Sequence, residues 1–463
     1  MAAVAGTAQW SSRFAFIMAA VGSSVGLGNL WRFSAEAGAN GGGAFILIYL
    51  LAVVLVCIPV LMSEYLVGRS GSSANAIDSV ADNAIRSGVT RNWSVLAWVG
   101  MVAGFLIVTF YCVVAAWVMR YVFKFLTGDF RGLDADAVGA AFGNFIGSPL
   151  QVLPWFLAFA LLTTYLVSRG VNRGIELAAK VLMPLFFILL AGLALFGLIS
   201  NAGNGGTAEA LAFLYRPDFT KVTADVAVAA LGQAFFSVGI GSAIMITYGS
   251  YLPREVSIPN AALIVGLTDT AVALIAGLAI FPIVFAFNLE AGAGAGLFFV
   301  TLPNAFNAMG GLGPVLGAAF FFLAFFAAIT SSVSLLEPSA AFVKERFGTT
   351  KAKAAWIMGA VMIVIGLISV FGQWEQPNSD GVMERSPTAA LDLIDGFTGN
   401  VMLPLAGLLI VIFVGWRLDK AILAEQFAGS EALGRVLLFL TRFVAPIFVG
   451  IVFVSSVYNT YFA

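Results

Sequence analysis

The sequence predicts an all-α integral membrane protein, and three observations support that fold class. Of the 463 residues, 60% are hydrophobic and only 10% are charged, whereas a soluble domain has about 25% charged residues. Eleven apolar segments are each long enough for the roughly 20-residue helix that crosses a bilayer. Two of these segments are interrupted by glycine-rich sequences, a pattern typical of helices that unwind inside a membrane protein.

Polar loops separate the eleven predicted spans, which argues against a set of buried helices in a soluble core. The spans form two groups of five, about 13–199 and about 226–415, and one extra helix, about 435–459, within one transmembrane domain over residues 1–463. The predicted spans are 13–37, 43–69, 93–124, 150–168, 175–199, 226–250, 260–287, 313–343, 353–371, 392–415 and 435–459. The long loops, expected to be irregular or partly helical, are 125–149, 200–225, 288–312 and 372–391.

The distribution of basic residues predicts the orientation of the chain. Most of its 23 Lys and Arg residues, such as Arg69, Lys344 and Arg417, fall in loops on the same side as the N-terminus. Positively charged loops stay in the cytoplasm, so the N-terminus is predicted to be cytoplasmic and the C-terminus to lie outside. The expected location is the inner (plasma) membrane, and the N-terminal residues show no signal-peptide pattern.

Composition also argues against several functional classes. The formal net charge of −1 gives no basic footprint for nucleic acid. The chain has no histidine, which removes imidazole as a metal ligand or catalytic base. Cys57 and Cys112 both fall in apolar segments, so we expect no disulfide. With no histidine and with carboxylates scattered over different spans, an enzyme is the least favoured class.

The two glycine-rich interruptions are the strongest functional signal in the sequence. They read Gly-Ser-Ser-Val-Gly-Leu-Gly-Asn over 22–29 and Ser-Val-Gly-Ile-Gly-Ser over 237–242. Each glycine inside a helix costs about 1 kcal/mol relative to alanine. Unwound backbone leaves half-helix ends that attract anions and cations. Paired breaks in two halves of a chain point to a transporter binding site, whereas a single break would slightly favour helix packing.

Polar side chains accompany these breaks in the apolar segments. Asn29 follows the first break, and Asp269 lies in the seventh span, where an ionised carboxylate is expensive unless it is paired. Thr330–Ser332 in the eighth span could complete an oxygen-lined cation site or could instead link helices by hydrogen bonds. Glu64 is expected to accept hydrogen bonds from freed backbone amides.

Four strings in order along the chain resemble the neurotransmitter:sodium symporter family, in particular its bacterial leucine-transporter-like members. The strings are Gly22–Phe33 (GSSVGLGNLWRF), Asn40–Phe45 (NGGGAF), Gly232–Ser237 (GQAFFS) and Thr330–Ser332 (TSS). The resemblance covers nearly the whole chain. It implies an inverted repeat of five plus five helices with discontinuous helices 1 and 6. The implied function is sodium-coupled uptake of hydrophobic L-amino acids, aromatic ones among them, by alternating access.

The resemblance also assigns residues to two sodium sites, a substrate site and two gates. The sodium ligands would be the carbonyl of Ser24, the amide oxygen of Asn29, the carbonyl and hydroxyl of Ser237 and Asp269 in the first site, and the carbonyls of Gly22, Val25 and Ala327 with the hydroxyls of Thr330 and Ser331 in the second. The substrate would contact Ser24, Leu27, Gly28, Ile107, Tyr111, Phe236, Ser237, Gly239, Ser242, Ser331 and Leu335. The gates would use Arg32, Asp395, Tyr111 and Phe236 on the outside and Trp10 and Glu345 on the inside.

The sequence departs from the family pattern at informative positions. Asp269 stands where many members have asparagine, and its negative charge predicts chloride independence; a register shift would put Thr268 there instead. Thr7 replaces the usual inner-gate arginine, so the partner of Glu345 is open. Ser242 replaces an aromatic residue of the substrate pocket, which predicts a roomy apolar pocket.

Other functions remain open from the residues alone. The transported solute could be another small zwitterion such as a betaine or osmolyte, or coupling could use protons through Asp269 or Glu64. A channel or a ligand-binding receptor would share the same composition. The predicted partners are an amino-acid substrate and membrane lipid, without nucleic acid, and the oligomeric state is not predicted.

Overall fold

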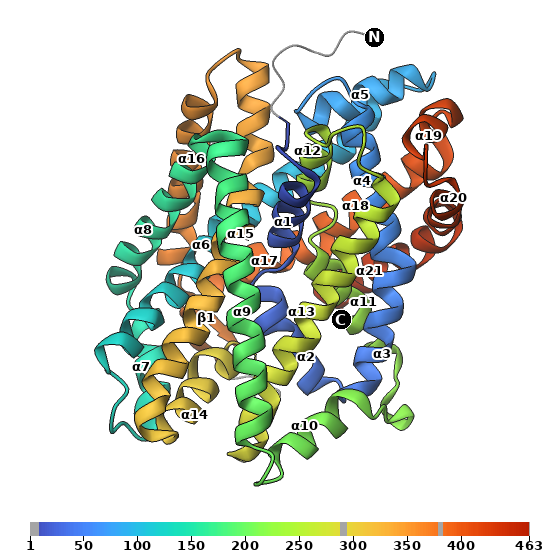
Figure 1. Ribbon diagram of the computed structural model, residues 1–463. Helices are drawn as coiled ribbons and strands as arrows, with labels where there is room; N and C mark the ends of the chain where they lie inside the picture. The colour runs from blue at the N-terminus through green and yellow to red at the C-terminus, as the bar shows by residue number, and fades with distance from the viewer. Residues whose placement is uncertain (1–8, 288–293, 378–382, 463) are drawn as a thin grey trace.

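A bundle of long helices makes up the computed structural model, which describes residues 9–287, 294–377 and 383–462. The long helices α9, α13 and α15 run side by side through it (Figure 1). The helices of the first half are α1 Arg13–Ser24, α2 Phe33–Ala39, α3 Gly43–Ala52, α4 Ile58–Ser70, α5 Ala76–Arg86, α6 Val95–Thr127, α7 Ala135–Ile146, α8 Pro149–Ser168, α9 Glu176–Ser200 and α10 Gly206–Tyr215. Those of the second half are α11 Ala224–Val238, α12 Ile244–Ser250, α13 Ile258–Ala286, α14 Leu302–Ala308, α15 Gly313–Arg346, α16 Lys351–Phe371, α17 Ala389–Phe397, α18 Leu403–Ile412, α19 Lys420–Gln426, α20 Glu431–Phe439 and α21 Ala445–Tyr461.

The described helices account for the predicted spans. Nine runs of helix are long and apolar enough to cross a membrane, and the bent pair Arg13–Ser24 and Gly28–Ala39, with a 54° angle, makes a tenth. The predicted sixth span is divided into α11 and α12, each too short to cross a bilayer alone. The number eleven therefore holds only when this broken pair is counted as one span.

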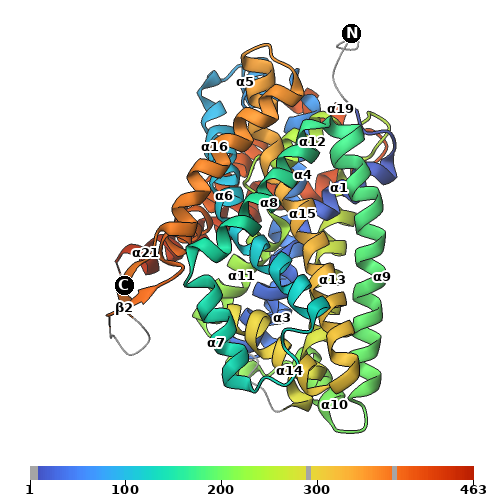
Figure 2. The ribbon, with the colours of Figure 1, turned by 90° about the vertical axis from the view of Figure 1, so that its left-hand side faces the viewer.

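Three of the four long loops contain the short helices that the sequence led us to expect. The helices α7, α10 and α14 lie at the end of the bundle away from the N-terminus (Figure 1). The fourth loop differs from the irregular or partly helical structure expected for it, because its described residues include an antiparallel hairpin of β1 (Trp374–Pro377) and β2 (Met383–Ser386). This hairpin and α21 lie on the opposite side of the bundle from α9 (Figure 2).

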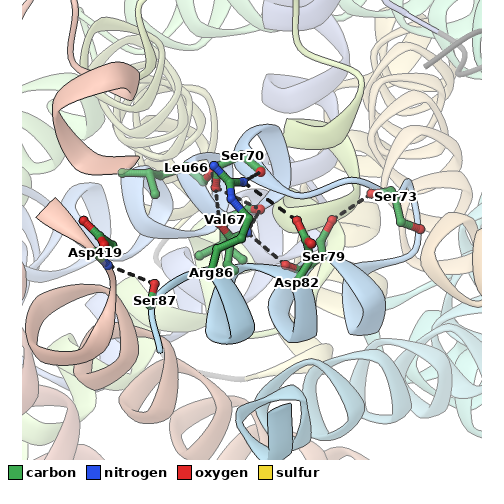
Figure 3. A network of polar contacts seen from close by, with 10 residues as sticks. Leu66, Val67, Ser70, Ser73, Ser79, Asp82, Arg86, Ser87 and Asp419 are labelled. Atoms are coloured by element: carbon green, nitrogen blue, oxygen red, sulfur yellow. Dashed lines mark hydrogen bonds and ion pairs between the residues drawn. The ribbon is translucent and has the colours of Figure 1, made fainter. Parts of the chain in front are cut away.

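A network of polar contacts fixes α5 against the end of α4 (Figure 3). Arg86 donates to the carbonyl oxygen of Ser70 at 2.5 Å and pairs with Asp82 at 3.8 Å. The hydroxyl of Ser79 donates to the carbonyl of Ser73 at 2.7 Å, which holds the start of α5. The amide of Asp419 donates to the Ser87 hydroxyl at 2.9 Å, so the segment before α19 joins the same assembly.

Two features of the buried core follow from the structure. Cys57 and Cys112 are both buried free thiols, as their apolar surroundings predicted. The helices α4 and α12 pack at backbone distance, because a Cβ atom at Gly68 would lie 1.9 Å from the carbonyl oxygen of Ile246. This close approach holds α12 in place although it is the shorter of the two helices in the broken sixth span.

Replacement of Gly68 by alanine should therefore destabilise the protein. The added methyl group has no space beside the Ile246 backbone, and overpacking of this kind costs about 1–3 kcal/mol. We expect a lower melting temperature for the purified Gly68→Ala protein than for the wild type. Gly192→Ala on α9, where no described atom lies within 4 Å of the new Cβ, is the control and should melt at or above the wild-type temperature. Equal melting temperatures for both variants would contradict the packing role of Gly68.

Candidate functional site

Both glycine-rich sequences are unwound, and the two breaks lie side by side. The helix α1 ends at Ser24 and resumes at Gly28, with Val25 in an extended conformation. Between α11 and α12, Gly239, Gly241 and Ala243 have φ values of 71°, 83° and 60°. The Ser24 hydroxyl donates to the carbonyl of Val238 at 3.0 Å, a direct link between the breaks. The prediction of two discontinuous helices is confirmed.

Ala243 is the one non-glycine residue with positive φ in the described part of the chain. A non-glycine residue in this conformation costs of order 1–3 kcal/mol and persists only where the surrounding structure enforces it. Such strain is concentrated at functional sites. The backbone of the second break is therefore held in a specific shape rather than simply disordered.

A fully buried polar cluster joins the first break to α11 and α13. The Asn29 side-chain amide donates to Ser237 Oγ at 2.9 Å and to Asp269 Oδ1 at 2.8 Å. The Ser237 hydroxyl donates to Asp269 Oδ2 at 2.8 Å, and the Tyr49 hydroxyl lies 3.3 Å from Ser237 Oγ. The amide oxygen of Asn29 accepts from the backbone amide of Gly26 at 2.9 Å.

The charge balance of this cluster is unusual. Asp269 is completely buried, and its hydrogen-bond partners Asn29 and Ser237 are both neutral. A buried carboxylate without a positive partner is strongly destabilising, so the cluster suits a cation or a proton. The described residues contain no group of three or more His, Cys, Asp or Glu side chains that could hold a metal ion. One carboxylate among neutral oxygens favours a singly charged hard cation over a transition metal.

A second group of oxygens lies where α15 contacts the first break. The Ser331 hydroxyl is 3.4 Å from the carbonyl oxygens of Gly22 and Val25 and 3.3 Å from that of Ser23. The Thr330 hydroxyl donates to the carbonyl of Ala327 at 3.1 Å. Carbonyl and hydroxyl oxygens are the ligands of hard cations. All five residues assigned to the second sodium site are thus close to this junction.

A cavity of about 70 Å³ lies between the two breaks. All eleven predicted substrate-contacting residues line it, from α1, α6, α11, α15 and the two breaks. The Leu27 amide points to the Tyr111 hydroxyl at 3.3 Å, so a polar group of α6 faces the start of the second half-helix. The cavity is also lined by four residues that the sequence reasoning missed: Ser23, Gly26, Ile244 and Leu403. Ser23 and Gly26 lie within the first glycine-rich string and Ile244 lies two residues after the second, so these three could have been included, whereas nothing in the local sequence marks Leu403.

The outer side of this cavity is only partly as predicted. Arg32 and Asp395 line a common larger cavity of about 330 Å³, together with the lid residues Tyr111 and Phe236. The expected ion pair between them is absent from the described structure. The guanidinium of Arg32 lies 4.3 Å from the centre of the Phe236 ring and 4.0 Å from Glu36. Glu36 is one helical turn away, which makes it the nearer carboxylate.

The inner side is closed by aromatic residues. Trp10 is 3% exposed, donates through its indole to the carbonyl of Tyr248 at 3.2 Å, and packs edge-on against the rings of Tyr248 and Tyr251. The buried Glu176 carboxylate holds the next residue, Ser11, through its backbone amide at 3.0 Å, and is paired with Lys180 at 2.6 Å. The N-terminal segment is therefore fixed to the start of α9.

Glu345 has a partner that the sequence did not suggest. Its carboxylate accepts hydrogen bonds from the Ser73 hydroxyl and from the backbone amides of Ala74 at 3.1 Å and Asn75 at 3.2 Å. Glu345 thus links the end of α15 to the loop before α5. Thr7, which replaces the expected inner-gate arginine, lies outside the described residues.

A buried ion pair lies close to the inner side and was missed from the sequence. Glu337, with no exposed side-chain surface, lies 2.7 Å from Lys351 at the start of α16. The Tyr251 hydroxyl donates to the same carboxylate at 3.0 Å. This pair connects α15 and α16 to Tyr251, which follows α12 and packs against the ring of Trp10.

Comparison with known proteins identifies the family. A statistical model of the sodium:neurotransmitter symporter family matches residues 7–132 and 147–462. The chain belongs to this family. It is 36% identical over 457 residues to the sodium-dependent transporter YhdH of Bacillus subtilis, with 97% of each chain covered. It is 30% identical over 459 residues to a sodium-dependent transporter of Haemophilus influenzae, with 97% of this chain and 98% of that protein covered.

A solved structure agrees with this assignment. The crystal structure of MhsT in complex with L-phenylalanine superposes with a TM-score of 0.86 at 40% identity, covering 97% of this chain and all of the MhsT chain. A more distant relative is the sodium-dependent nutrient amino acid transporter 1 of Drosophila mojavensis, 24% identical over 424 residues, which cover 80% of this chain and 65% of that protein. The chain is thus a multi-pass membrane protein of a sodium-coupled transporter family, as the sequence motifs predicted.

Replacement of Lys351 by methionine should strongly destabilise the protein. It leaves the buried carboxylate of Glu337 without its cation, and breaking a buried pair from one side costs about 3–5 kcal/mol. We expect a markedly lower melting temperature for Lys351→Met than for Lys351→Arg. The double variant Lys351→Met with Glu337→Gln should recover much of the loss, because no unpaired charge remains. A single variant as stable as the wild type would show that the pair is not structural.

Proposed function

We propose that this protein imports hydrophobic L-amino acids, aromatic ones among them, together with sodium ions by alternating access. The observation that carries this proposal is the cavity between the two breaks, which adjoins both oxygen clusters. An apolar wall and free backbone groups in one cavity suit a zwitterion with an apolar side chain. The phenylalanine bound to MhsT, at 40% identity to this chain, supports the same substrate class.

The substrate backbone would bind between the half-helices. Its carboxylate would meet the amides of Leu27 and Gly28 and the Tyr111 hydroxyl, because the N-terminal end of a helix attracts negative charge. Its amino group would meet the carbonyls of Ser24 and Phe236, with that of Ser237 beside them. A substrate bound in this way joins the two breaks directly.

Two sodium ions would be held by the two oxygen clusters. The first site would use the carbonyl of Ser24, the amide oxygen of Asn29, both oxygens of Ser237 and the Asp269 carboxylate, completed by the substrate carboxylate. Sodium there would supply the positive charge that buried Asp269 lacks. The second site would use the carbonyls of Gly22, Val25 and Ala327 with the hydroxyls of Thr330 and Ser331.

Chloride would not be needed in this arrangement. Asp269 places a fixed negative charge at the first sodium site. This charge would take the place of the negative charge that a bound chloride would otherwise supply near the cation. Coupling would therefore depend on sodium and not on chloride.

The gates would open in turn around the fixed site. Sodium would favour the outward-facing state, in which Arg32 stays with Glu36 and away from Asp395. The lid residues Tyr111 and Phe236 would then close over the substrate. Loss of the second sodium to the cytoplasm would free α1 and release the closure made by Trp10. In this cycle the N-terminus faces the cytoplasm and the C-terminus the outside of the plasma membrane.

Binding of the twenty amino acids to the purified protein, measured in sodium and in potassium at constant chloride, tests this proposal. We expect sodium-dependent binding that is confined to hydrophobic and aromatic amino acids. Replacement of chloride by gluconate should leave it unchanged. Binding that is equal in sodium and potassium would contradict sodium coupling, and uptake into vesicles that is driven by a pH gradient without sodium would favour proton coupling through Asp269 or Glu64. Binding of betaine in place of any amino acid would contradict the substrate class.

Replacement of Asp269 by asparagine should separate the roles of charge and geometry. Asparagine keeps one oxygen but removes the charge, so we expect at least a tenfold loss of apparent sodium affinity and a new stimulation by chloride. Sodium titrations of amino-acid binding in chloride and in gluconate measure both effects. Asp225→Asn, at an exposed position on α11, is the matched control. Wild-type sodium affinity in Asp269→Asn would exclude Asp269 from the first site.

A further inference from the structure

Two long uncharged stretches of the chain end at arginine residues. No Asp, Glu, Lys or Arg occurs over residues 396–416 or 443–461. At a rise of 1.5 Å per residue, each stretch is about 30 Å long, which matches the hydrocarbon thickness of a bilayer. Arg417 follows the first stretch and Arg442 precedes the second. Both arginines therefore lie at the boundary between hydrocarbon and headgroups, on the cytoplasmic side in the orientation proposed above.

The segments that carry these arginines touch. Phe413–Arg417 and Leu440–Val444 are both π-helical, and a Cβ at Gly415 would lie 3.1 Å from the Cα of Arg442. Arg442 Nε donates to the carbonyl of Gly415 at 2.5 Å, and the Trp416 indole donates to the carbonyl of Arg442 at 3.1 Å. These reciprocal hydrogen bonds fix the Arg442 side chain across the end of the tenth predicted span.

The Arg442 guanidinium is held in one orientation, but most of its donors have no acceptor. Its central carbon lies 5.8 Å from the centre of the Trp416 ring, within the range of a cation–π contact. In the part of the chain that the structure describes, Arg442 forms no ion pair, and neither of its Nη atoms has a hydrogen-bond acceptor. A guanidinium carries five donors in a planar fork. The four on the Nη atoms therefore remain for a ligand, and this fork matches the geometry of a phosphate group.

The surroundings of this guanidinium carry an excess of positive charge. Arg417, Lys420 and Arg435 are all exposed, and α19 and α20 between them lie at one edge of the bundle (Figure 1). The acidic side chains of the same segment already have partners: Asp419 accepts from the Ala421 amide at 2.7 Å, Glu425 pairs with Arg254 at 3.4 Å and Glu431 accepts from the Gly429 amide at 2.9 Å. An anion near Arg442 would therefore meet mainly basic groups.

An exposed aromatic surface adjoins the basic residues on the hydrocarbon side. Trp416, Phe439 and Phe443 are 57%, 57% and 46% exposed. The ring of Phe443 lies 5.6 Å from that of Trp416 and 5.2 Å from that of Phe439. Aromatic rings at this depth contact the glycerol and the first methylene groups of lipids. An arginine that only extends its charge toward water would not need the fixed side chain seen here.

We propose that Arg442 and Trp416 form a binding site for the headgroup of an anionic phospholipid. The lipid phosphate would bind the Nη atoms of Arg442, and the upper part of the acyl chains would lie on Trp416 and Phe443. The excess positive charge favours a lipid of net negative charge, such as phosphatidylglycerol, over zwitterionic phosphatidylcholine. A bound lipid would cover the junction of the tenth and eleventh predicted spans, whichever solute is transported.

Native mass spectrometry of the full-length purified protein tests this site, by titration with phosphatidylglycerol and phosphatidylcholine of identical acyl chains. We expect one phosphatidylglycerol per chain to bind at least tenfold more tightly than phosphatidylcholine. Arg442→Gln removes the fork and should weaken phosphatidylglycerol at least tenfold, with little effect on phosphatidylcholine. Arg169→Gln, at an exposed arginine that follows α8, is the matched control and should stay within twofold of the wild type.

Each other outcome would overturn the site. Phosphatidylglycerol affinity within twofold of the wild type in folded Arg442→Gln would exclude Arg442, and an equal loss in Arg169→Gln would indicate attraction to overall charge alone. Displacement of the lipid by millimolar inorganic phosphate would indicate a site for a free anion. A wild-type dimer that Arg442→Gln converts to a monomer, with no lipid bound, would assign this face to a second copy of the chain.

A second variant covers the case in which Arg442→Gln does not fold. Trp416→Leu removes the ring and its hydrogen bond to the Arg442 carbonyl but keeps every charge. Without these contacts the guanidinium is no longer held in one orientation, so we expect phosphatidylglycerol to bind at least threefold more weakly. Unchanged affinity in Trp416→Leu would contradict a site built from both residues.

Discussion

The buried contact of Asn29, Ser237 and Asp269 is the interaction on which the rest of the structure depends. It joins the break in the first span to α11 and to α13 through hydrogen bonds of 2.8–2.9 Å. It also places a carboxylate in a region where it has only neutral partners. Such an arrangement is costly for stability alone, and the sodium ion proposed above would complete it. The same residues hold the broken helices together and, in that proposal, make their closure dependent on an ion.

The remaining elements keep the two breaks close without closing them permanently. The Glu64 carboxylate accepts a hydrogen bond from the backbone amide of Gly241, and the start of α18 packs against the same glycine. At the predicted inner gate, Trp10 packs against Tyr248, and the Glu176 carboxylate accepts a hydrogen bond from the adjoining backbone amide of Ser11. These contacts use hydrogen bonds, aromatic packing and ion pairs that can separate one at a time. The alternating access proposed above would use these contacts on each side of the site.

Much of this could be predicted from the sequence, because the strongest signals are local. Hydropathy gave the helical spans, and glycine spacing gave the two breaks. The eleven residues assigned to the substrate through the family resemblance all line one cavity. Contacts that depend on how the helices are rotated and how they cross could not be predicted from the sequence. Three contacts could not be predicted for this reason. Arg32 lies near Glu36 rather than Asp395, and Lys351 pairs with Glu337 on the preceding helix. The third is Leu403, which lines the cavity. The hairpin at Trp374–Pro377 was missed because its loop sequence carries no alternating pattern long enough to predict a strand.

The central claim is that one site couples an amino acid to sodium through the cluster containing Asp269. Thermodynamic linkage requires that the substrate raise sodium affinity by the same factor by which sodium raises substrate affinity. The most direct measurement is radiolabelled sodium binding to the purified protein with and without L-phenylalanine, compared with phenylalanine binding with and without sodium. The account predicts equal coupling factors of at least tenfold in the wild type. Sodium binding that is unaffected by a bound amino acid would contradict a shared site.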